Sequence, residues 1–194
     1  TEPTKSVAIN ALLDEDLPEL LLRLGRDHAR IAQINAQLAK VSDQLAEADA
    51  GLGSQDAQDC QALWDEVADC LEFLKHFADK AHHPLEDRLF DAVLHKGLTP
   101  TERHLVFRNL GQHQEIMTLT DALTGYIHRA RNGMVIDMPV FVECLDEYLS
   151  LQRRHMTFEE MHMFPLLMSR LDNDDWNRFY AELSPQFPTS ELEK

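Results

Sequence analysis

The chain has 194 residues and 44% of them are apolar, so it can bury a sizeable core and form one domain. Its formal net charge of −16 excludes an electrostatic footprint for nucleic acid and disfavours docking on anionic lipid. With only 7 glycines and 8 prolines, the composition favours long helices over a turn-rich β-sandwich. We see no apolar run near the roughly 18 residues of a membrane span. The three cysteines form no CxxC pair, so we expect a cytoplasmic protein.

The first half of the chain carries the hydrophobic pattern of two long helices. The first is expected to begin near Asp16-Leu17-Pro18, where an N-capping residue precedes an early proline, and to end before Gly51. Between these points apolar residues recur at steps of three, four and seven, which is typical of one buried helix face. The second helix is expected from about Asp56 to Lys96. Pro84 lies inside it and predicts a local kink or a lost backbone hydrogen bond.

The second half of the chain predicts two more long helices and a short one. The third helix opens with Thr99-Pro100-Thr101-Glu102, a capping box with proline at its first position, and ends near Arg131-Asn132-Gly133. The fourth helix is expected from about Asp137 to Arg170. A short fifth helix, from about Asp174 to Leu183, carries aromatic residues that should pack on the end of the bundle.

Four helices joined by short connections are expected to run up and down in turn. The sequence therefore predicts an all-α fold: an up-down-up-down four-helix bundle with a short C-terminal helix. We expect an N-terminal extension over residues 1–13, the four-helix bundle over residues 14–171, and the short helix with a mobile tail over residues 172–194.

Histidine is unusually frequent, with ten residues in the chain. Two of them begin an H-x-x-x-E motif, His82 with Glu86 and His155 with Glu159. Residues four apart share a helix face, so one metal ion could contact both side chains of a motif. Taken alone this pattern is weak evidence, because acidic residues are common throughout the chain.

Six residues fall at one depth of the predicted bundle. Counted from the expected helix ends at about 1.5 Å per residue, all of them lie roughly 15–22 Å from the same end. They are His28, His82, Glu86, His113, His155 and Glu159. Their helix rows are otherwise apolar, as for His28 between Leu24 and Ile31, so we expect all six side chains to face the core.

Four imidazoles and two carboxylates need partners in an apolar core. Either they satisfy one another as a buried polar network or they hold metal, and we favour metal. Six ligands exceed what one tetrahedral site uses, so two ions are implied. Two carboxylates that can bridge, with two histidines per ion, suit two iron ions joined by an oxo or hydroxo bridge. Manganese or zinc would also suit these ligands.

The six residues lie in four segments: Arg26-Asp27-His28, His82-His83-Pro84-Leu85-Glu86-Asp87, Gln112-His113-Gln114-Glu115, and His155-Met156-Thr157-Phe158-Glu159-Glu160 followed by Phe164-Pro165. The second and fourth segments are quite specific in combination. From about Asp14 to Arg170 the chain resembles the hemerythrin-like HHE cation-binding domains, in the form of a stand-alone bacterial-type hemerythrin domain protein. The resemblance implies that the four histidines of the layer are terminal ligands and the two glutamates are bridges.

The pattern departs from that of the invertebrate oxygen carriers at two points. They have a second histidine four residues after the one on the third helix, where this chain has Met117. Their acid on the fourth helix follows its histidine by five residues, whereas Glu159 follows His155 by four. The ligand set is therefore more symmetric and looks more like that of the hemerythrin-domain repair proteins.

Three residues beside the layer need separate interpretations. His162 follows Glu159 by three residues, which is the Glu-x-x-His spacing of a ferritin-like metal face, so it is a candidate seventh metal ligand. Otherwise it lies behind the ligands or at the rim of the site. His83 and Asp87 are rotated by about 100° from the preceding ligands. We expect them to pack or to hydrogen-bond behind those ligands.

The other histidines and one tyrosine complete the polar inventory. Tyr148 either donates a hydrogen bond to a bound ligand or is an ordinary core tyrosine with a satisfied hydroxyl. The remaining histidines lie at other depths of the bundle and are expected at the surface. They are His76, His95, His104 and His128.

Three functions of different classes fit these features. The first is a non-haem di-iron protein whose open coordination positions bind O₂, NO or peroxide, for sensing, scavenging or iron handling. The second is a di-iron redox enzyme of the peroxidase, NO reductase or ferroxidase type, or an iron-centre repair protein; turnover with a reductant distinguishes an enzyme. The third is a structural bundle with adventitious zinc or no metal. The acidic surface would suit a basic electron donor.

Overall fold

All regular elements in the described part of the chain are helical. The computed structural model describes residues 18–49, 51 and 57–183. In chain order its elements are α2 (Glu19–Asp49), α3 (Ala57–Leu74), the π-helix η1 (Lys75–His82), α4 (His83–Leu94), α5 (Pro100–Arg131), α6 (Met138–Phe158), the π-helix η2 (Glu159–Met163), α7 (Phe164–Arg170) and α8 (Asn173–Leu183). The predicted extension over residues 1–13, the tail over residues 184–194 and the N-cap at Asp16 lie outside the described residues.

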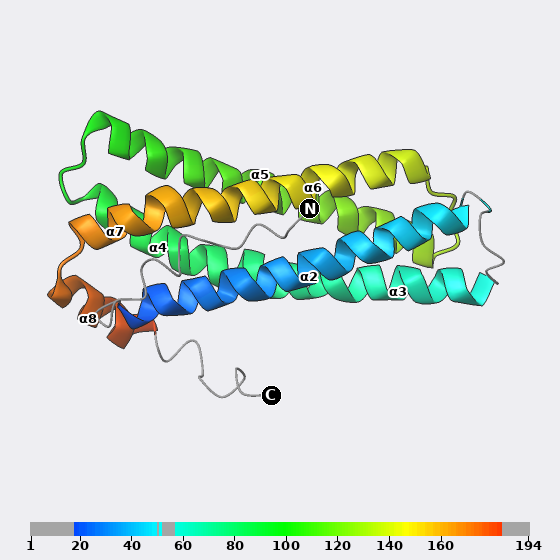
Figure 1. Ribbon diagram of the computed structural model, residues 1–194, viewed down its shortest axis with the longest axis horizontal. Coiled ribbons are helices and arrows are strands. Elements are labelled where there is room, and N and C mark those ends of the chain that lie inside the picture. The colour runs from blue at the N-terminus through cyan, green and yellow to red at the C-terminus, as the bar shows by residue number, and fades with distance from the viewer. Residues whose placement is uncertain (1–17, 50, 52–56, 184–194) are drawn as a thin grey trace, which may run out of the picture.

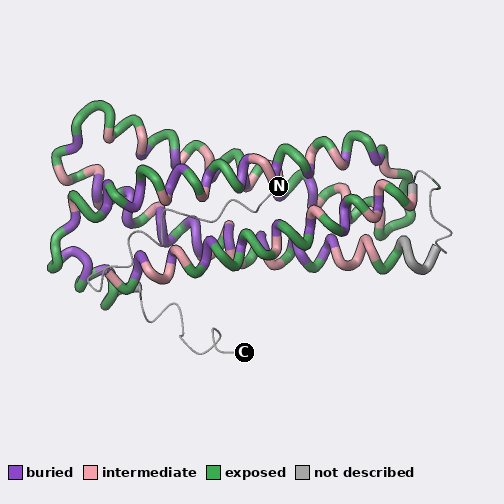
Figure 2. Tube along the Cα trace, viewed as in Figure 1, coloured by how far each residue is buried: buried purple, intermediate pink, exposed green. Residues whose placement is uncertain are grey.

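The long helices lie side by side along the longest axis of the molecule (Figure 1). Helix α2 packs against α3 and α6, and α5 packs against the same two helices, so these helices surround a common core. Buried residues line the inner faces of the helices along their length (Figure 2). The predicted all-α fold class is confirmed for the described residues. The short helix α8 packs against α2 and buries Trp176 and Phe179, as expected for a helix at the bundle end.

The start of α5 shows the predicted capping box. The Thr99 hydroxyl accepts a hydrogen bond from the Glu102 backbone N–H at 3.2 Å, and the Glu102 carboxylate accepts one from the Thr99 backbone N–H at 2.8 Å. The Arg170 guanidinium at the end of α7 also donates to this carboxylate, at 2.6 Å. The Arg170 and Thr99 hydrogen bonds lower the pKa of Glu102 to about 2. One carboxylate thus caps α5 and joins it to α7.

Two π-helical segments interrupt the second and fourth predicted helices. Each is followed within two residues by a proline, Pro84 after η1 and Pro165 after η2. Proline has no N–H to donate, and its ring crowds the carbonyl four residues earlier, so a wider turn before it relieves both problems. The disturbance predicted at Pro84 therefore takes the form of a π-helix. The second π-helix was not anticipated.

The core consists of two apolar clusters. One surrounds Leu24, Leu89 and Phe158 and extends to α8. The other surrounds Ile31 and Ile116 and extends toward the opposite end of the bundle. In each of the four long segments, the histidine and any glutamate of the predicted layer lie between residues of the first cluster and residues of the second. A buried polar layer therefore separates the two clusters.

Candidate metal centre

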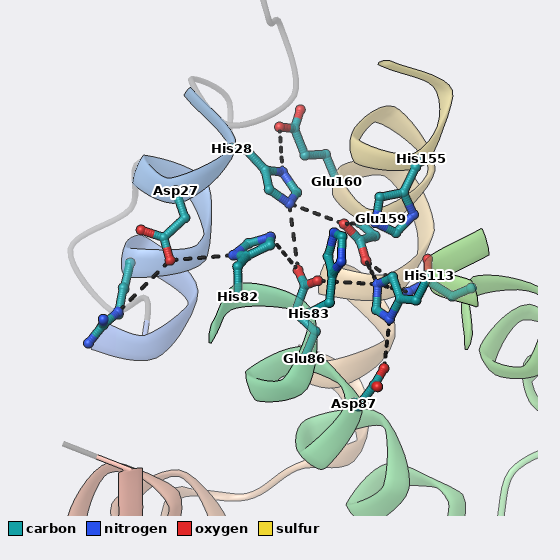
Figure 3. A network of polar contacts seen from close by, with 12 residues as sticks. Asp27, His28, His82, His83, Glu86, Asp87, His113, His155, Glu159 and Glu160 are labelled. Carbon is teal, nitrogen blue, oxygen red and sulfur yellow. Dashed lines mark hydrogen bonds and ion pairs between the residues drawn. The ribbon is translucent and has the colours of Figure 1, made fainter. Parts of the chain in front are cut away.

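The structure brings together the six residues of the predicted layer (Figure 3). Each of them is at most 2% exposed. They come from all four long segments: His28 from α2, His82 from the end of η1, Glu86 from α4, His113 from α5, His155 from α6 and Glu159 from the start of η2. The predicted convergence of these side chains is thus observed.

One half of the cluster contains the first two histidines. The Nε2 atom of His28 lies 3.1 Å from Glu159 Oε2 and 3.6 Å from Glu86 Oε1. The Nε2 atom of His82 lies 3.3 Å from the same oxygen of Glu86. One ligand atom from each of these four residues lies within 4.8 Å of the others. This half can hold one metal ion.

The other half contains the remaining two histidines. The Nε2 atom of His113 lies 3.4 Å from Glu86 Oε2 and 3.4 Å from Glu159 Oε1. The Nε2 atom of His155 lies 3.3 Å from Glu159 Oε2. These four residues also form a group with ligand atoms within 4.8 Å of one another. Both carboxylates belong to both groups, so each lies between two potential metal positions.

The inward-facing atoms are buried without sufficient hydrogen bonds. Atoms without a hydrogen-bond partner include Nε2 of His28, His82 and His155, both carboxylate oxygens of Glu86, and Oε2 of Glu159. Leaving such atoms unpaired in an apolar core costs free energy, and a cation bound to them removes that cost. These atoms therefore do not form a buried polar network whose members satisfy one another's hydrogen bonds. The donor set fits bound metal.

The outer nitrogen of each of the four histidines in the cluster faces a side-chain oxygen. The four Nδ1–oxygen pairs are His113 to Asp87 at 2.6 Å, His28 to Glu160 at 3.2 Å, His82 to Asp27 at 3.4 Å, and His155 to Gln112 at 3.4 Å. An oxygen acceptor favours a proton on Nδ1, which leaves the Nε2 lone pair directed toward the centre. These contacts therefore orient all four rings for metal binding.

These outer contacts form a closed cycle around the bundle. Each oxygen belongs to a residue adjacent in sequence to one of the six cluster residues, yet it contacts a histidine on a different helical segment. Asp27 on α2 contacts the second long segment, Asp87 on α4 contacts α5, Gln112 on α5 contacts α6, and Glu160 on η2 contacts α2. The hydrogen-bonding role predicted for Asp87 is confirmed, whereas the roles of the other three were not anticipated.

Asn109 is a further residue of the site that was not predicted from the sequence. It is fully buried, and its Nδ2 donates a hydrogen bond to Glu159 Oε1 at 2.8 Å. It lies one turn before His113 on α5, in the same buried row. A polar residue four positions before a candidate ligand was the signal that could have identified it.

The charges of the cluster are set by its own members. Burial opposes a charge on His28, but the facing carboxylates of Glu159 and Glu86 and the Glu160 carboxylate that contacts its Nδ1 prevail and raise its pKa well above the ordinary value. Burial likewise opposes the ionised form of Glu159, but the facing histidines hold its pKa well below the ordinary range. Burial lowers the pKa of His155 to about 4. The cluster thus combines charged carboxylates with imidazoles in different protonation states.

The structure does not bring His162 into the cluster. It is exposed, and its ring lies beside Phe158 with 5.1 Å between ring centroids. Among the described residues it belongs to no group of side chains that could hold a metal ion. The Glu-x-x-His argument assumed an α-helix, but Glu159 begins a π-helix, whose wider turn carries the residue three positions later away from that face.

The remaining expectations concern packing and exposure. His83 is buried against the rings of His82, His113 and His155, which agrees with a packing role. The Tyr148 hydroxyl accepts a hydrogen bond from Gln152 Nε2 at 3.0 Å, so Tyr148 is a core tyrosine with a satisfied hydroxyl. The histidines predicted at the surface are all exposed; they are His76, His95, His104 and His128.

A family model decides the relationship of this chain to known proteins. The model described as the hemerythrin HHE cation-binding domain matches residues 20–167, which is most of the chain. The chain belongs to the hemerythrin HHE family. Cation binding, typically of iron, is the property of these hemerythrin domains, and the six-residue cluster lies inside the matched range. No curated protein matches the chain.

A helix that crosses a bilayer must be both long and apolar. Within residues 18–49 and 57–183, no helix is both long enough and apolar enough to cross a bilayer.

Proposed function

We propose that this hemerythrin-family protein is a non-haem di-iron protein that binds a small oxidant or diatomic ligand. In this proposal His28 and His82 hold one ion, His113 and His155 hold the other, and Glu86 and Glu159 bridge them. The observation that carries the proposal is the set of buried, inward-facing nitrogen and oxygen atoms without hydrogen-bond partners. The proposal includes an up-down-up-down order of the four segments, which is expected because their connections are short.

The ligand set suggests how such a centre would work. Each ion would receive two imidazole nitrogens and two carboxylate oxygens from the protein, which would leave coordination positions for O₂, NO or peroxide. Iron in this site supplies the redox chemistry that the side chains themselves lack. The protein's contribution is to hold the ligands in place and to determine what can approach them.

Orientation is the first task of the side chains. The cycle of outer contacts keeps the four Nε2 atoms directed inward, and the amide of Asn109 holds one oxygen of Glu159. Exclusion of water is the second task. The walls of the site include Leu24, Leu89 and Ile116, each without measurable exposure. An apolar wall slows the loss of a reactive species to solvent, which suits sensing, scavenging or iron handling.

A ligand-challenge experiment tests this function. Protein loaded with Fe(II) without oxygen would be mixed in turn with O₂, NO and hydrogen peroxide while its absorption spectrum is followed. The proposal expects at least one ligand to change the spectrum at a stoichiometry of one per iron pair. The matched control is the Asp91→Asn variant, changed on the exposed face of α4 outside the cluster. No spectral change with any of the three, in protein that holds two irons per chain, would contradict the proposed function.

A further inference from the structure

His83 is a buried imidazole that the proposed ligand set leaves unused. It is 2% exposed, and neither of its ring nitrogens has a hydrogen-bond partner. The carboxylate near it is that of Asp79, with Nδ1 to Oδ1 at 3.6 Å, which is too long for a hydrogen bond. Burying a polar ring without partners costs free energy. A fold that buries this ring is expected to have a partner for it that is not part of the chain.

The position of His83 indicates where that partner would lie. Its ring stacks on His113 with 4.4 Å between centroids and meets the edge of His155 at 5.4 Å. One ligand atom from each of these three histidines lies within 4.8 Å of the others. Figure 3 shows the ring of His83 beside that of His113. His83 therefore borders the half of the centre that His113 and His155 form.

The geometry distinguishes His83 from the ligand histidines. Each of those four has its Nε2 within 3.6 Å of a Glu86 or Glu159 oxygen, whereas the carboxylate contact of His83 is with Asp79. The planes of the His83 and His113 rings differ by only 17°. Two imidazoles on adjacent positions of one ion have converging axes, because each nitrogen lies about 2 Å from the metal. Near-parallel stacking is therefore not expected of two rings bound to one ion, although one nitrogen of His83 lies within 4.8 Å of one nitrogen of His113.

We propose that His83 borders the exogenous-ligand position of the ion held by His113 and His155, and that its ring N–H donates a hydrogen bond to an anion bound there. The class of ligand is a small anion that accepts hydrogen bonds, such as azide or deprotonated peroxide. His83 is a binding residue for that anion and not a metal ligand. This inference rests on the proposed dinuclear centre.

Azide is the probe in the experiment that tests this role. Ferric protein would be titrated with azide and the new charge-transfer absorption followed, with iron content measured on the same samples. The His83→Phe variant keeps a ring that can stack on His113 but removes the N–H. Its azide Kd should rise by about tenfold to a hundredfold, because a hydrogen bond to a charged group is lost in a dry site. His83→Gln keeps an N–H donor and should recover part of the affinity.

Controls separate this role from the alternatives. His95→Phe makes the same chemical change on the exposed residue that follows α4, and its azide Kd should equal that of the unchanged protein. If circular dichroism shows that His83→Phe does not fold, His83→Leu takes its place. An azide Kd unaffected by the loss of the N–H would overturn the inference. Loss of one iron from the variant would also overturn it, because His83 would then be a ligand.

Failure of the underlying centre has a different signature. If the unchanged protein, loaded with iron under the same conditions, holds no iron pair, then the proposed function fails and this inference fails with it. If the unchanged protein holds two irons and binds azide, the centre stands and the variants alone decide the role of His83.

Discussion

Replacing Asp87 by asparagine tests whether the outer contacts tune the metal centre. Asp87 accepts the shortest of the four, with His113 Nδ1 at 2.6 Å from its carboxylate. Removing such a partner typically weakens metal binding by about tenfold to a hundredfold, or about 1.4–2.7 kcal/mol. The Asp87 side chain is 42% exposed, so solvent screens its charge and the lower end applies. We expect a loss of about tenfold, or about 1.4 kcal/mol.

The assay is a two-step metal titration against a chromophoric chelator. Because His113 contributes to one half of the centre, Asp87→Asn should weaken one of the two binding steps and leave the other near its original affinity. Asp91→Asn, one turn further along α4 and exposed, is the matched control and should leave both steps unchanged. If Asp87→Asn weakens both binding steps equally, or if the two variants have the same metal affinities, the outer contact of Asp87 does not tune the half of the centre that contains His113.

Three further outcomes follow from the structure. His82→Ala or Glu159→Ala should reduce metal binding below two ions per chain while most of the helical circular dichroism is kept; two metals in both variants would contradict the ligand assignment. Metal affinity should rise steeply from pH 6 to pH 8, because His28 and His113 have raised pKa values in the metal-free cluster and must lose their protons to bind metal; a titration flat over this range would oppose it. Glu102→Gln should lower the Tm at pH 7. The Tm difference between the two proteins should shrink as pH falls from about 4.3, the ordinary glutamate pKa, to about 2, the pKa of Glu102 in the folded protein. The reason is that protonation of Glu102 removes the same interactions from the unchanged protein. A Tm difference that does not depend on pH would count against this.

The layer of six residues was predictable because depth in a helical bundle follows from counting. The rise per residue is nearly constant, so His28 on the first helix and His155 on the fourth could be placed at one level before their helices were seen together. The inward direction followed from the apolar rows on which they lie. The capping box at Thr99 was predictable for the same reason: both of its partners lie within one turn of a single helix.

Contacts between helices were harder to predict than positions along one. Asp27 neighbours His28 in sequence but contacts His82 on another segment, and this pairing depends on how the two helices are rotated against each other. Hydrophobic periodicity defines a face to within a broad stripe, not the rotation that selects one atom of a partner. The cycle of outer contacts was therefore visible only in the structure.

The two π-helices explain the other differences between sequence and structure. Helical spacing rules assume 3.6 residues per turn, and they fail where the turn widens. His162 was expected on the face of Glu159, but η2 begins at Glu159 and His162 is exposed. His83 directly follows η1, and its close packing on His113 was likewise not evident from α-helical spacing. Both segments precede a proline, and this was the sequence signal for them.

Metal content per chain tests the central claim most directly. The protein would be produced in iron-supplemented minimal medium and measured by elemental analysis together with its absorption spectrum. A di-iron centre predicts two irons per chain with the near-ultraviolet charge-transfer absorption of a bridged ferric pair. Protein that is free of iron, or that holds a single zinc ion, would contradict the assignment of the six converging residues as a di-iron centre.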